Sequence, residues 1–208
     1  TLLGIIREGR LLPWDHDIDF AVWDSETTRD EIINIFTDNG YKEERVFGDM
    51  DCLHFYGENK KIDISFYKTE NGLSSVKWAI PPDSLIVKTY LYCVQVIWSG
   101  SDKNIELFEN FLKRGVQIIL NKSSLLLSFI LPIKVKKLLY LNAINFLNYT
   151  GYSYPVDLMR LHTVQYKNTK IQVPIDSSQC LELTYGKDWK IPRENYIWHE
   201  EAKNLINL

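Results

Sequence analysis

The sequence predicts an α+β fold, a mixed β-sheet with flanking helices and a helical insertion. In the first hundred residues, short apolar runs alternate with turn residues, which is typical of strands with helices between them. After Asp102 the apolar residues take the 3.6-residue period of helices. With 208 residues, 45% of them hydrophobic, the chain can bury a core, and its 25% of charged residues excludes disorder as a description of the whole.

Local patterns locate the elements of the first hundred residues. A strand with one buried face is predicted where Ile18, Phe20 and Val22 alternate with polar or small residues. A helix follows, capped by Thr27 or Thr28. Further strands are predicted at 52–56, 61–67, 75–80 and 86–98, with turns at 57–60 and at Asn71-Gly72.

The second half is mainly helical. Asp102 is a suitable N-cap for a helix that reaches Ile119. Beyond it we expect helices at 124–131 and 134–147 broken at Pro132, a strand at 171–174 and a last helix at 177–185.

We therefore expect residues 1–208 to form a single domain. It would comprise an α/β core at 1–100, a helical insertion at 102–150 and a closing segment at 151–208. Because the sequence begins at Thr1, without Met and inside a structured motif, we also expect N-terminal residues of the full protein to precede it.

Composition narrows the possible partners and compartment. The net charge is -3 and the 24 basic residues do not exceed the 27 acidic ones, so no nucleic-acid partner is expected. The three cysteines lie far apart, which disfavours zinc and disulfides and favours a reducing compartment. No feature indicates an oligomeric state.

No signal peptide is visible, and the longest apolar stretch is Leu125–Ile133. This is about half of the roughly 20 residues that a membrane-spanning helix needs. We therefore expect a cytoplasmic protein. Lys134, Lys136 and Lys137 follow the apolar stretch, so peripheral contact with the inner face of the cell membrane is an alternative to an ordinary solvated helix face.

The chemistry is concentrated in PWDHDIDF, residues 13–20. Asp15, Asp17 and Asp19 occupy alternate positions, which lie on one face of an extended chain. Two carboxylates about 5 Å apart repel by roughly 3 kcal/mol at an effective dielectric constant of ~20. A hard divalent cation with oxygen ligands, Mg²⁺ or Mn²⁺, would relieve this repulsion, and the alternative is an acidic turn exposed to water.

A third carboxylate is predicted from KKIDISFY, residues 60–67. Asp63 lies between two apolar residues and must point to the opposite face, so it joins Asp17 and Asp19 if the two strands are neighbours. Three such acids suit metal-assisted phosphoryl transfer. Upstream, Gly4 would let backbone amides approach a phosphate and Arg7 could pair with it.

His54, on the preceding strand, either reaches a substrate or is a strand residue with a hydrogen-bond partner, and the sequence leaves both open.

These segments resemble a known family. TLLGIIREGRLLPWDHDIDF (1–20) resembles the signature of the LicD family, which includes bacterial phosphocholine transferases and the eukaryotic fukutin and fukutin-related proteins. KKIDISFY resembles the family's second acidic strand, and LELTYGKDWKIP (181–192) resembles its closing segment. No family motif covers the helical middle of the chain.

The resemblance implies a nucleotidyltransferase-like fold and transfer of a phospho-alcohol, such as phosphocholine or ribitol phosphate, from a CDP-activated donor. The acceptor would be a hydroxyl of a cell-surface or lipid-linked glycan, with Mg²⁺ as cofactor and CMP as product. Carried over to this sequence, it implies the following roles: Asp17 and Asp19 as metal ligands, Asp63 as the third acid, Asp15 as a supporting residue, Gly4 and Arg7 facing donor phosphates. It implies no zinc, because the cysteine cluster of the fukutin-related protein is missing.

Two other functions remain open. An NTP-dependent nucleotidyltransferase acting on a sugar phosphate would use the same acids. A non-catalytic nucleotide- or glycan-binding module is disfavoured, because it would have no reason to keep Asp17, Asp19 and Asp63 close to one another.

Overall fold

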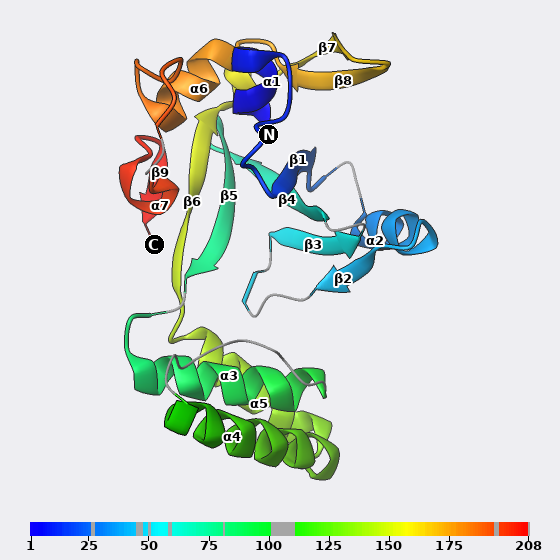
Figure 1. The fold of residues 1–208 in the computed structure, drawn as a ribbon, viewed down its shortest axis with the longest axis vertical. Helices are drawn as coiled ribbons and strands as arrows, with labels where there is room; N and C mark the ends of the chain where they lie inside the picture. Colours follow the sequence, from blue (N-terminus) through cyan, green and yellow to red (C-terminus); the bar gives the residue numbers. More distant parts are fainter. Residues whose placement is uncertain are drawn as a thin grey trace. The chain divides into compact units, whose positions relative to one another are not determined.

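The structure is a computed structural model, and it describes residues 1–25, 28–44, 48–49, 51–57, 60–80, 82–100, 111–193 and 196–207. It confirms the α+β class, with a mostly antiparallel sheet and helices (Figure 1). The chain forms two compact units. The first comprises Thr1–Trp78 and Tyr149–Leu208, and the second comprises Ala79–Asn148.

A seven-stranded sheet is the framework of the first unit. Its strands are β1 (Asp17–Trp23), β2 (Lys42–Glu44), β3 (Cys52–Gly57), β4 (Lys60–Glu70), β5 (Leu73–Ile80), β6 (Asn148–Pro155) and β9 (Leu205–Asn207). The order is β2-β3-β4-β5-β6-β9, and β1 pairs with β4 in parallel. The other elements are α1 (Leu2–Glu8), α2 (Arg29–Asp38), the 3₁₀ turn η1 (Val156–Met159), α6 (Ser177–Tyr185), α7 (Trp198–Glu201) and a hairpin of β7 (Leu161–Tyr166) and β8 (Thr169–Pro174).

Helix α2 and one face of the sheet form the main core. The helix starts as predicted at Thr28, whose hydroxyl accepts from the Glu31 amide while the Glu31 carboxylate accepts from the Thr28 amide. The buried cluster consists of Ile32, Leu53, Phe55, Ile62, Ile64 and Phe66. Ile18 and Val22 pack against it, whereas Phe20 is 48% exposed, so the predicted buried face of β1 is only partly buried.

The predicted hairpins of this sheet are present. β3 and β4 pair antiparallel, and β4 turns into β5 at Asn71-Gly72. Both turn residues have positive φ, 51° and 78°, as a tight turn between right-twisted strands requires. The predicted strand at 171–174 and helix at 177–185 are confirmed by β8 and α6.

The strand predicted at 86–98 is wrong, because this segment is the helix α3 (Leu85–Ser99) of the second unit. Its β-branched and aromatic composition favours a strand, but burial of Leu91, Val94 and Ile97 follows helical spacing. A run of this length without turn residues also exceeds a normal strand. The helices therefore begin well before Asp102, which itself lies outside the described residues.

The second unit also contains the helices α4 (Phe111–Ile130) and α5 (Ile133–Ile144). Pro132 separates them as predicted, since its ring cannot continue a helix. Among the described helices none is long and apolar enough to cross a membrane.

Gly151 allows β5 and β6 to approach closely. A Cβ at this position would lie 1.8 Å from the carbonyl oxygen of Val76, a backbone atom that cannot move aside. We predict that Gly151→Ala lowers the free energy of unfolding by about 3 kcal/mol or more, measured by urea unfolding. The matched control is Gly115→Ala in α4, where nothing lies within 4 Å of the added Cβ. It should leave stability unchanged or raise it by up to about 1 kcal/mol, and equal losses at both sites would contradict the packing argument.

Candidate metal centre

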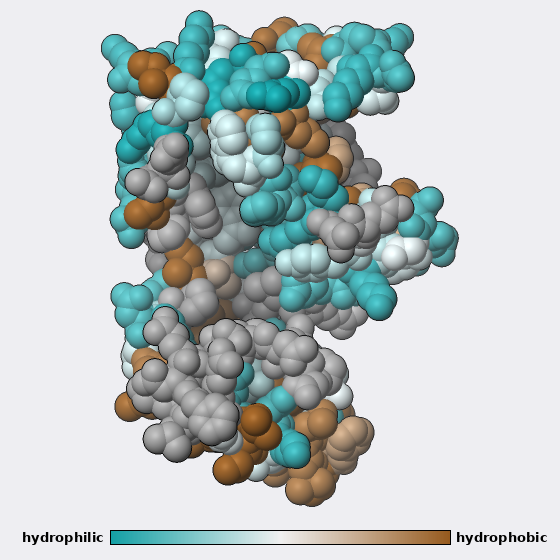
Figure 2. Space-filling model, in the orientation of Figure 1, coloured by the Kyte–Doolittle hydropathy of each residue, from teal (hydrophilic) through white to brown (hydrophobic). Residues whose placement is uncertain are grey.

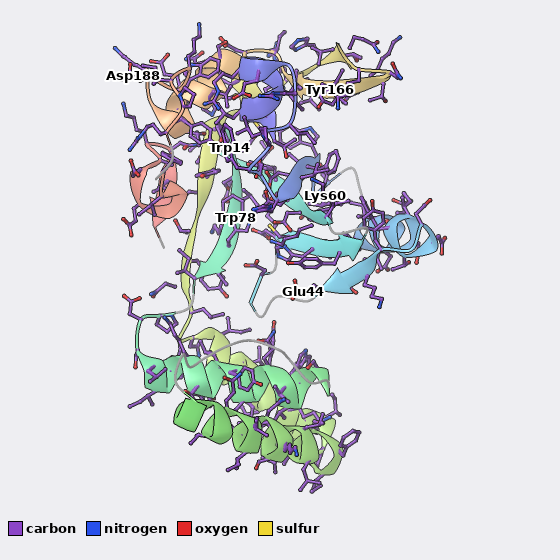
Figure 3. The ribbon with its side chains drawn as sticks, in the orientation of Figure 1. Trp14, Glu44, Lys60, Trp78, Tyr166 and Asp188 are labelled. Atoms are coloured by element: carbon purple, nitrogen blue, oxygen red, sulfur yellow. The ribbon has the colours of Figure 1, made fainter. Side chains whose placement is uncertain are left out.

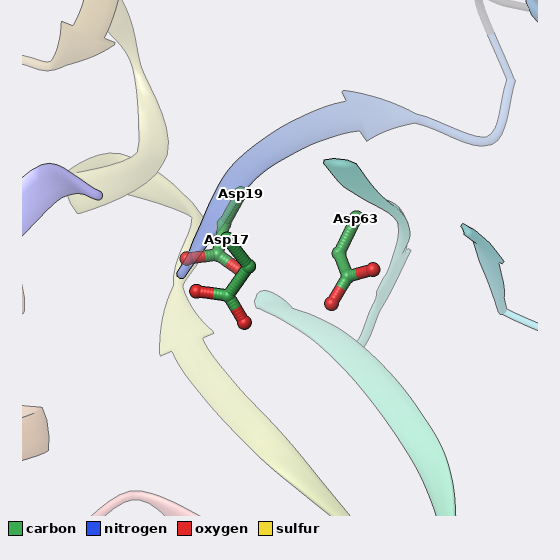
Figure 4. A group of neighbouring side chains, drawn as sticks. All are labelled: Asp17, Asp19 and Asp63. Carbon is green, nitrogen blue, oxygen red and sulfur yellow. The ribbon is translucent and has the colours of Figure 1, made fainter. Parts of the chain in front are cut away.

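Three carboxylates converge on one face of the sheet. Asp17 and Asp19 lie on β1 and Asp63 lies on β4, with Asp19 directly beside Asp63 in the parallel register. One oxygen of each carboxylate lies within 4.8 Å of the other two (Figure 4). The prediction that Asp63 joins Asp17 and Asp19 required their two strands to be neighbours, and β1 and β4 are neighbours.

Alternation along the strands explains this convergence. Ile18 beside Ile62 points to the core under α2, so the residues on either side of each must point to the other face. Because the apolar side chains hold the register, the acids cannot move apart by sliding one strand along the other.

The same face carries two rows of polar residues across four strands. The first row of paired residues contains Asp19, Asp63, His54 and Glu44. The second row contains Asp17, Lys61, Tyr56 and Lys42. The three acids therefore occupy one end of a polar face, on β1 and β4.

His54 and Lys61 hold Asp63 in place. His54 Nδ1 lies 2.8 Å from one oxygen of Asp63, and Lys61 Nζ donates to the other at 2.7 Å. The second ring nitrogen of His54 lies 3.0 Å from Asp49 Oδ2. The His54 side chain is only 8% exposed and has a hydrogen-bond partner at each ring nitrogen, and its predicted contact with a substrate stays a prediction.

These contacts set the charges. Burial alone would lower the pKa of His54, but hydrogen bonds to Asp49 and Asp63 raise it to about 9, so the imidazolium donates from both nitrogens. Burial would raise the pKa of Asp63, but the hydrogen bonds from His54 and Lys61 outweigh it and lower that pKa. Asp63 is therefore a fixed carboxylate with its charge balanced by protein cations.

Asp17 and Asp19 are in the opposite situation. Burial raises the pKa of Asp17, and a hydrogen bond with Asp15 and the charge of that residue raise it further. Loss of surrounding water also raises the pKa of Asp19, although 56% of its side chain is exposed, and the negative charges of Asp17 and Asp63 add to this shift. The fold thus holds two carboxylates where protein cations compensate them poorly. An all-oxygen donor set with excess negative charge fits Mg²⁺ or Mn²⁺.

The remaining predicted residues lie around this group or beside it. Asp15 contacts Asp17, as a supporting residue would. Gly4 is buried in α1, where an added Cβ would lie 2.7 Å from the carbonyl oxygen of Arg10. Close packing explains this glycine, and its predicted approach to a phosphate stays a prediction.

Arg7 lines a pocket between α1 and the segment after α6. Its side chain is 9% exposed, pairs with Glu8 at 2.9 Å and donates to the Trp189 carbonyl at 3.5 Å, while its buried Nε has no partner among the described residues. The pocket is lined by Leu3, Arg7, Leu12, Trp14, Tyr185, Asp188, Trp189, Ile191, Arg193 and Tyr196. Trp14 and Asp188 can be located in Figure 3.

The pocket and the acidic motif share a short segment of the chain. Trp14 precedes Asp15, and the negative charges of Asp15 and Asp19 contribute to raising the pKa of Tyr185, after the main effect of burial. The segment 185–196 and the N-terminal motif therefore line the same pocket.

Sequence reasoning missed Lys61 and Asp49. Lys61 could have been found, because it lies two residues before Asp63 and so on the same face of the strand. Asp49 could not, since it lies outside any strand and reaches His54 only through the fold.

Residues 1–95 match the family model described as LicD/FKTN/FKRP, nucleotidyltransferase domain. The match includes all three acids, and the predicted LicD resemblance is confirmed over residues 1–95. No curated protein and no solved structure matches the chain. A LicD family domain indicates a transferase of the phosphotransferase type that modifies glycans. The similarity of 181–192 to a family motif lies outside the match and stays a prediction.

We predict that His54→Ala destabilises the protein by about 2–4 kcal/mol, because Asp49 and Asp63 would be left in a largely buried setting without their shared cation. Urea unfolding in metal-free buffer measures this. His162→Ala, on an exposed position of β7, should cost less than about 0.5 kcal/mol. A His54 variant as stable as the His162 variant would show that the buried pairing is not needed.

Proposed function

We propose that the protein is a Mg²⁺-dependent phosphotransferase that moves a phospho-alcohol from a CDP-activated donor to a glycan hydroxyl and releases CMP. The observation that carries the proposal is the group of three carboxylates on β1 and β4, inside the part of the chain that matches the LicD model. A role without catalysis would give the fold no reason to keep these acids together at the cost of their repulsion.

Asp17 and Asp19 are proposed to hold the cation, with Asp63 completing the acidic group. When bound, Mg²⁺ would neutralise the charge on the donor phosphates and on the leaving CMP. The raised pKa values of Asp17 and Asp19 support this assignment, because burial and, after it, the neighbouring carboxylates disfavour their negative charge and a bound cation would offset both effects.

Asp63 is proposed as a ligand or positioning group for the reaction. A general base should have a pKa near the working pH, whereas the pKa of Asp63 is lowered and both its oxygens accept hydrogen bonds. Lys61 and His54 would then keep its carboxylate directed toward Asp17 and Asp19.

The donor is proposed to extend into the pocket beside Arg7. The Nε of Arg7, which has no partner in the part of the chain that the structure describes, offers a donor for a phosphate or base oxygen, and Trp14 and Tyr185 offer aromatic surface for stacking. Arg7 lines this pocket, which supports its predicted role in binding a donor phosphate.

We predict that Asp19→Asn lowers the rate of CMP release at least about 1,000-fold. The assay contains Mg²⁺ and, in turn, CDP-choline, CDP-ribitol, CDP-glycerol or CDP-ethanolamine. Asp38→Asn at the exposed end of α2 removes the same charge away from the acids and should keep full activity. If Asp19→Asn releases CMP as fast as the unaltered protein, the assignment of the metal centre is wrong.

We predict that Asp17→Asn has opposite effects with and without metal. Without metal it should raise stability by up to about 1 kcal/mol, because it removes a carboxylate that repels its neighbours. The unaltered protein should gain about 2.7 kcal/mol when Mn²⁺ is present at 100 times its dissociation constant, and the variant should not. Thermal unfolding with EDTA or Mn²⁺ measures both; equal Mn²⁺ stabilisation of the two proteins would contradict the site.

An NTP-dependent nucleotidyltransferase is the second candidate, favoured by the wording of the family model, which describes a nucleotidyltransferase domain. The product separates the two candidates. Release of pyrophosphate from an NTP with a sugar phosphate, and no CMP from any CDP-alcohol, would replace the first candidate by the second.

A further inference from the structure

Helix α4 has an unusual distribution of side chains for a helix in water. Among residues 115–130, whose burial is described, the most deeply buried are Ser124 and Ser128, each 4% exposed, whereas Leu126, Phe129 and Ile130 are 61%, 77% and 64% exposed. The Ser128 hydroxyl donates to the Leu125 carbonyl of its own helix at 2.6 Å. Small polar residues thus pack inward while large apolar residues point outward, the reverse of the usual amphipathic pattern.

The outward apolar residues gather where α4 turns into α5. We call the set of Leu126, Phe129, Ile130 and Ile133 the apolar tip; Ile133 is 68% exposed. The apolar surface continues along α5 through Leu138 and Leu141, which are 67% and 50% exposed. Figure 2 shows brown residues gathered at the lower edge of the helical unit. Large apolar side chains exposed in this number on two successive helices indicate an interaction site.

Positive charge surrounds this tip. Residues 111–144, which contain α4 and α5, hold six basic residues and no acidic one, so their net charge is +6 in a chain of net charge -3. Of these, Lys122, Lys134 and Lys137 are on exposed positions flanking the tip. The described helices cannot cross a membrane. Apolar residues bordered by lysines, on helices that are not long and apolar enough to span a membrane, are typical of segments that lie in the surface of an anionic bilayer.

We propose that the helical unit Ala79–Asn148 docks on an anionic lipid bilayer, with the apolar tip in the headgroup region and the surrounding lysines against lipid phosphates. A second copy of the chain is a poorer occupant, because two copies of the segment 111–144, each of net charge +6, would repel each other on contact. The inference stands on the helical unit alone and does not depend on the proposed phosphotransferase reaction.

Sedimentation with vesicles tests this proposal. The full chain should pellet with vesicles of phosphatidylcholine containing about 30% phosphatidylserine at least about tenfold more strongly than with pure phosphatidylcholine. Raising the salt to about 0.5 M should weaken the binding severalfold, since it screens the lysines. Equal binding to both vesicle types, or none to either, would overturn the proposal.

Variants distinguish binding through the apolar tip from nonspecific adsorption of the protein. Phe129→Ser with Ile133→Ser should reduce binding about tenfold or more, with an unchanged circular dichroism spectrum. Ile35→Ser on α2, which removes a residue that is 60% exposed in the first unit, is the matched control and should bind as before. Loss of binding in the control as well would overturn the assignment to the tip.

Two measurements separate the alternatives. Sedimentation velocity without lipid should give a monomer; a dimer that Phe129→Ser dissociates would mean that the tip is an interface between copies and would overturn the membrane proposal. CMP release from a soluble CDP-alcohol should be the same for Phe129→Ser and the unaltered protein, so failure of the phosphotransferase proposal would be seen separately from failure of this one.

Discussion

The parallel pairing of β1 with β4 is the constraint on which the candidate site depends. It sets Asp19 beside Asp63 and Asp17 beside Lys61. A shift of one residue would turn one strand's acids toward the core under α2 and expose its isoleucines. The acidic face therefore depends on the apolar face. Burial of Ile62 and Ile64 on one side of the sheet supplies the free energy that holds the mutually repelling carboxylates together on the other side.

The acids are also treated unequally by their surroundings. Asp63 has two cationic partners, one of them a nearly buried imidazolium that also bonds Asp49, whereas Asp17 and Asp19 face each other and Asp15. Asp63 is therefore an ionised and oriented carboxylate, whereas the charges of Asp17 and Asp19 have no comparable cationic partner among the described side chains. Such inequality between neighbouring acids is how one site can combine rigid orientation with affinity for a cation.

How much the sequence could reveal depends on the range of the interactions. The acidic face followed from alternation in 13–20 and 60–67, since period-two patterns fix which side chains share a face. The helix α3 was mistaken for a strand because composition competed with the periodicity of its burial. Asp49 beside His54, and Arg7 beside the carbonyl of Trp189, join positions that only the tertiary fold brings together.

The two units have opposite charge, and this bears on how a transferase of this kind would meet its acceptor. Residues 79–148 hold eight basic and four acidic residues, a net charge of +4, so the remainder of the chain has -7. An anionic surface attracts the first and repels the second. The acidic site lies in the repelled unit, and the apolar tip lies in the attracted one. If the acceptor glycan is carried by a lipid, adsorption through the helical unit would keep the chain at the membrane surface where that acceptor lies. The carboxylates themselves would not be drawn into contact with lipid phosphates. Such contact would be unfavourable, because lipid phosphates would compete with the donor for the cation.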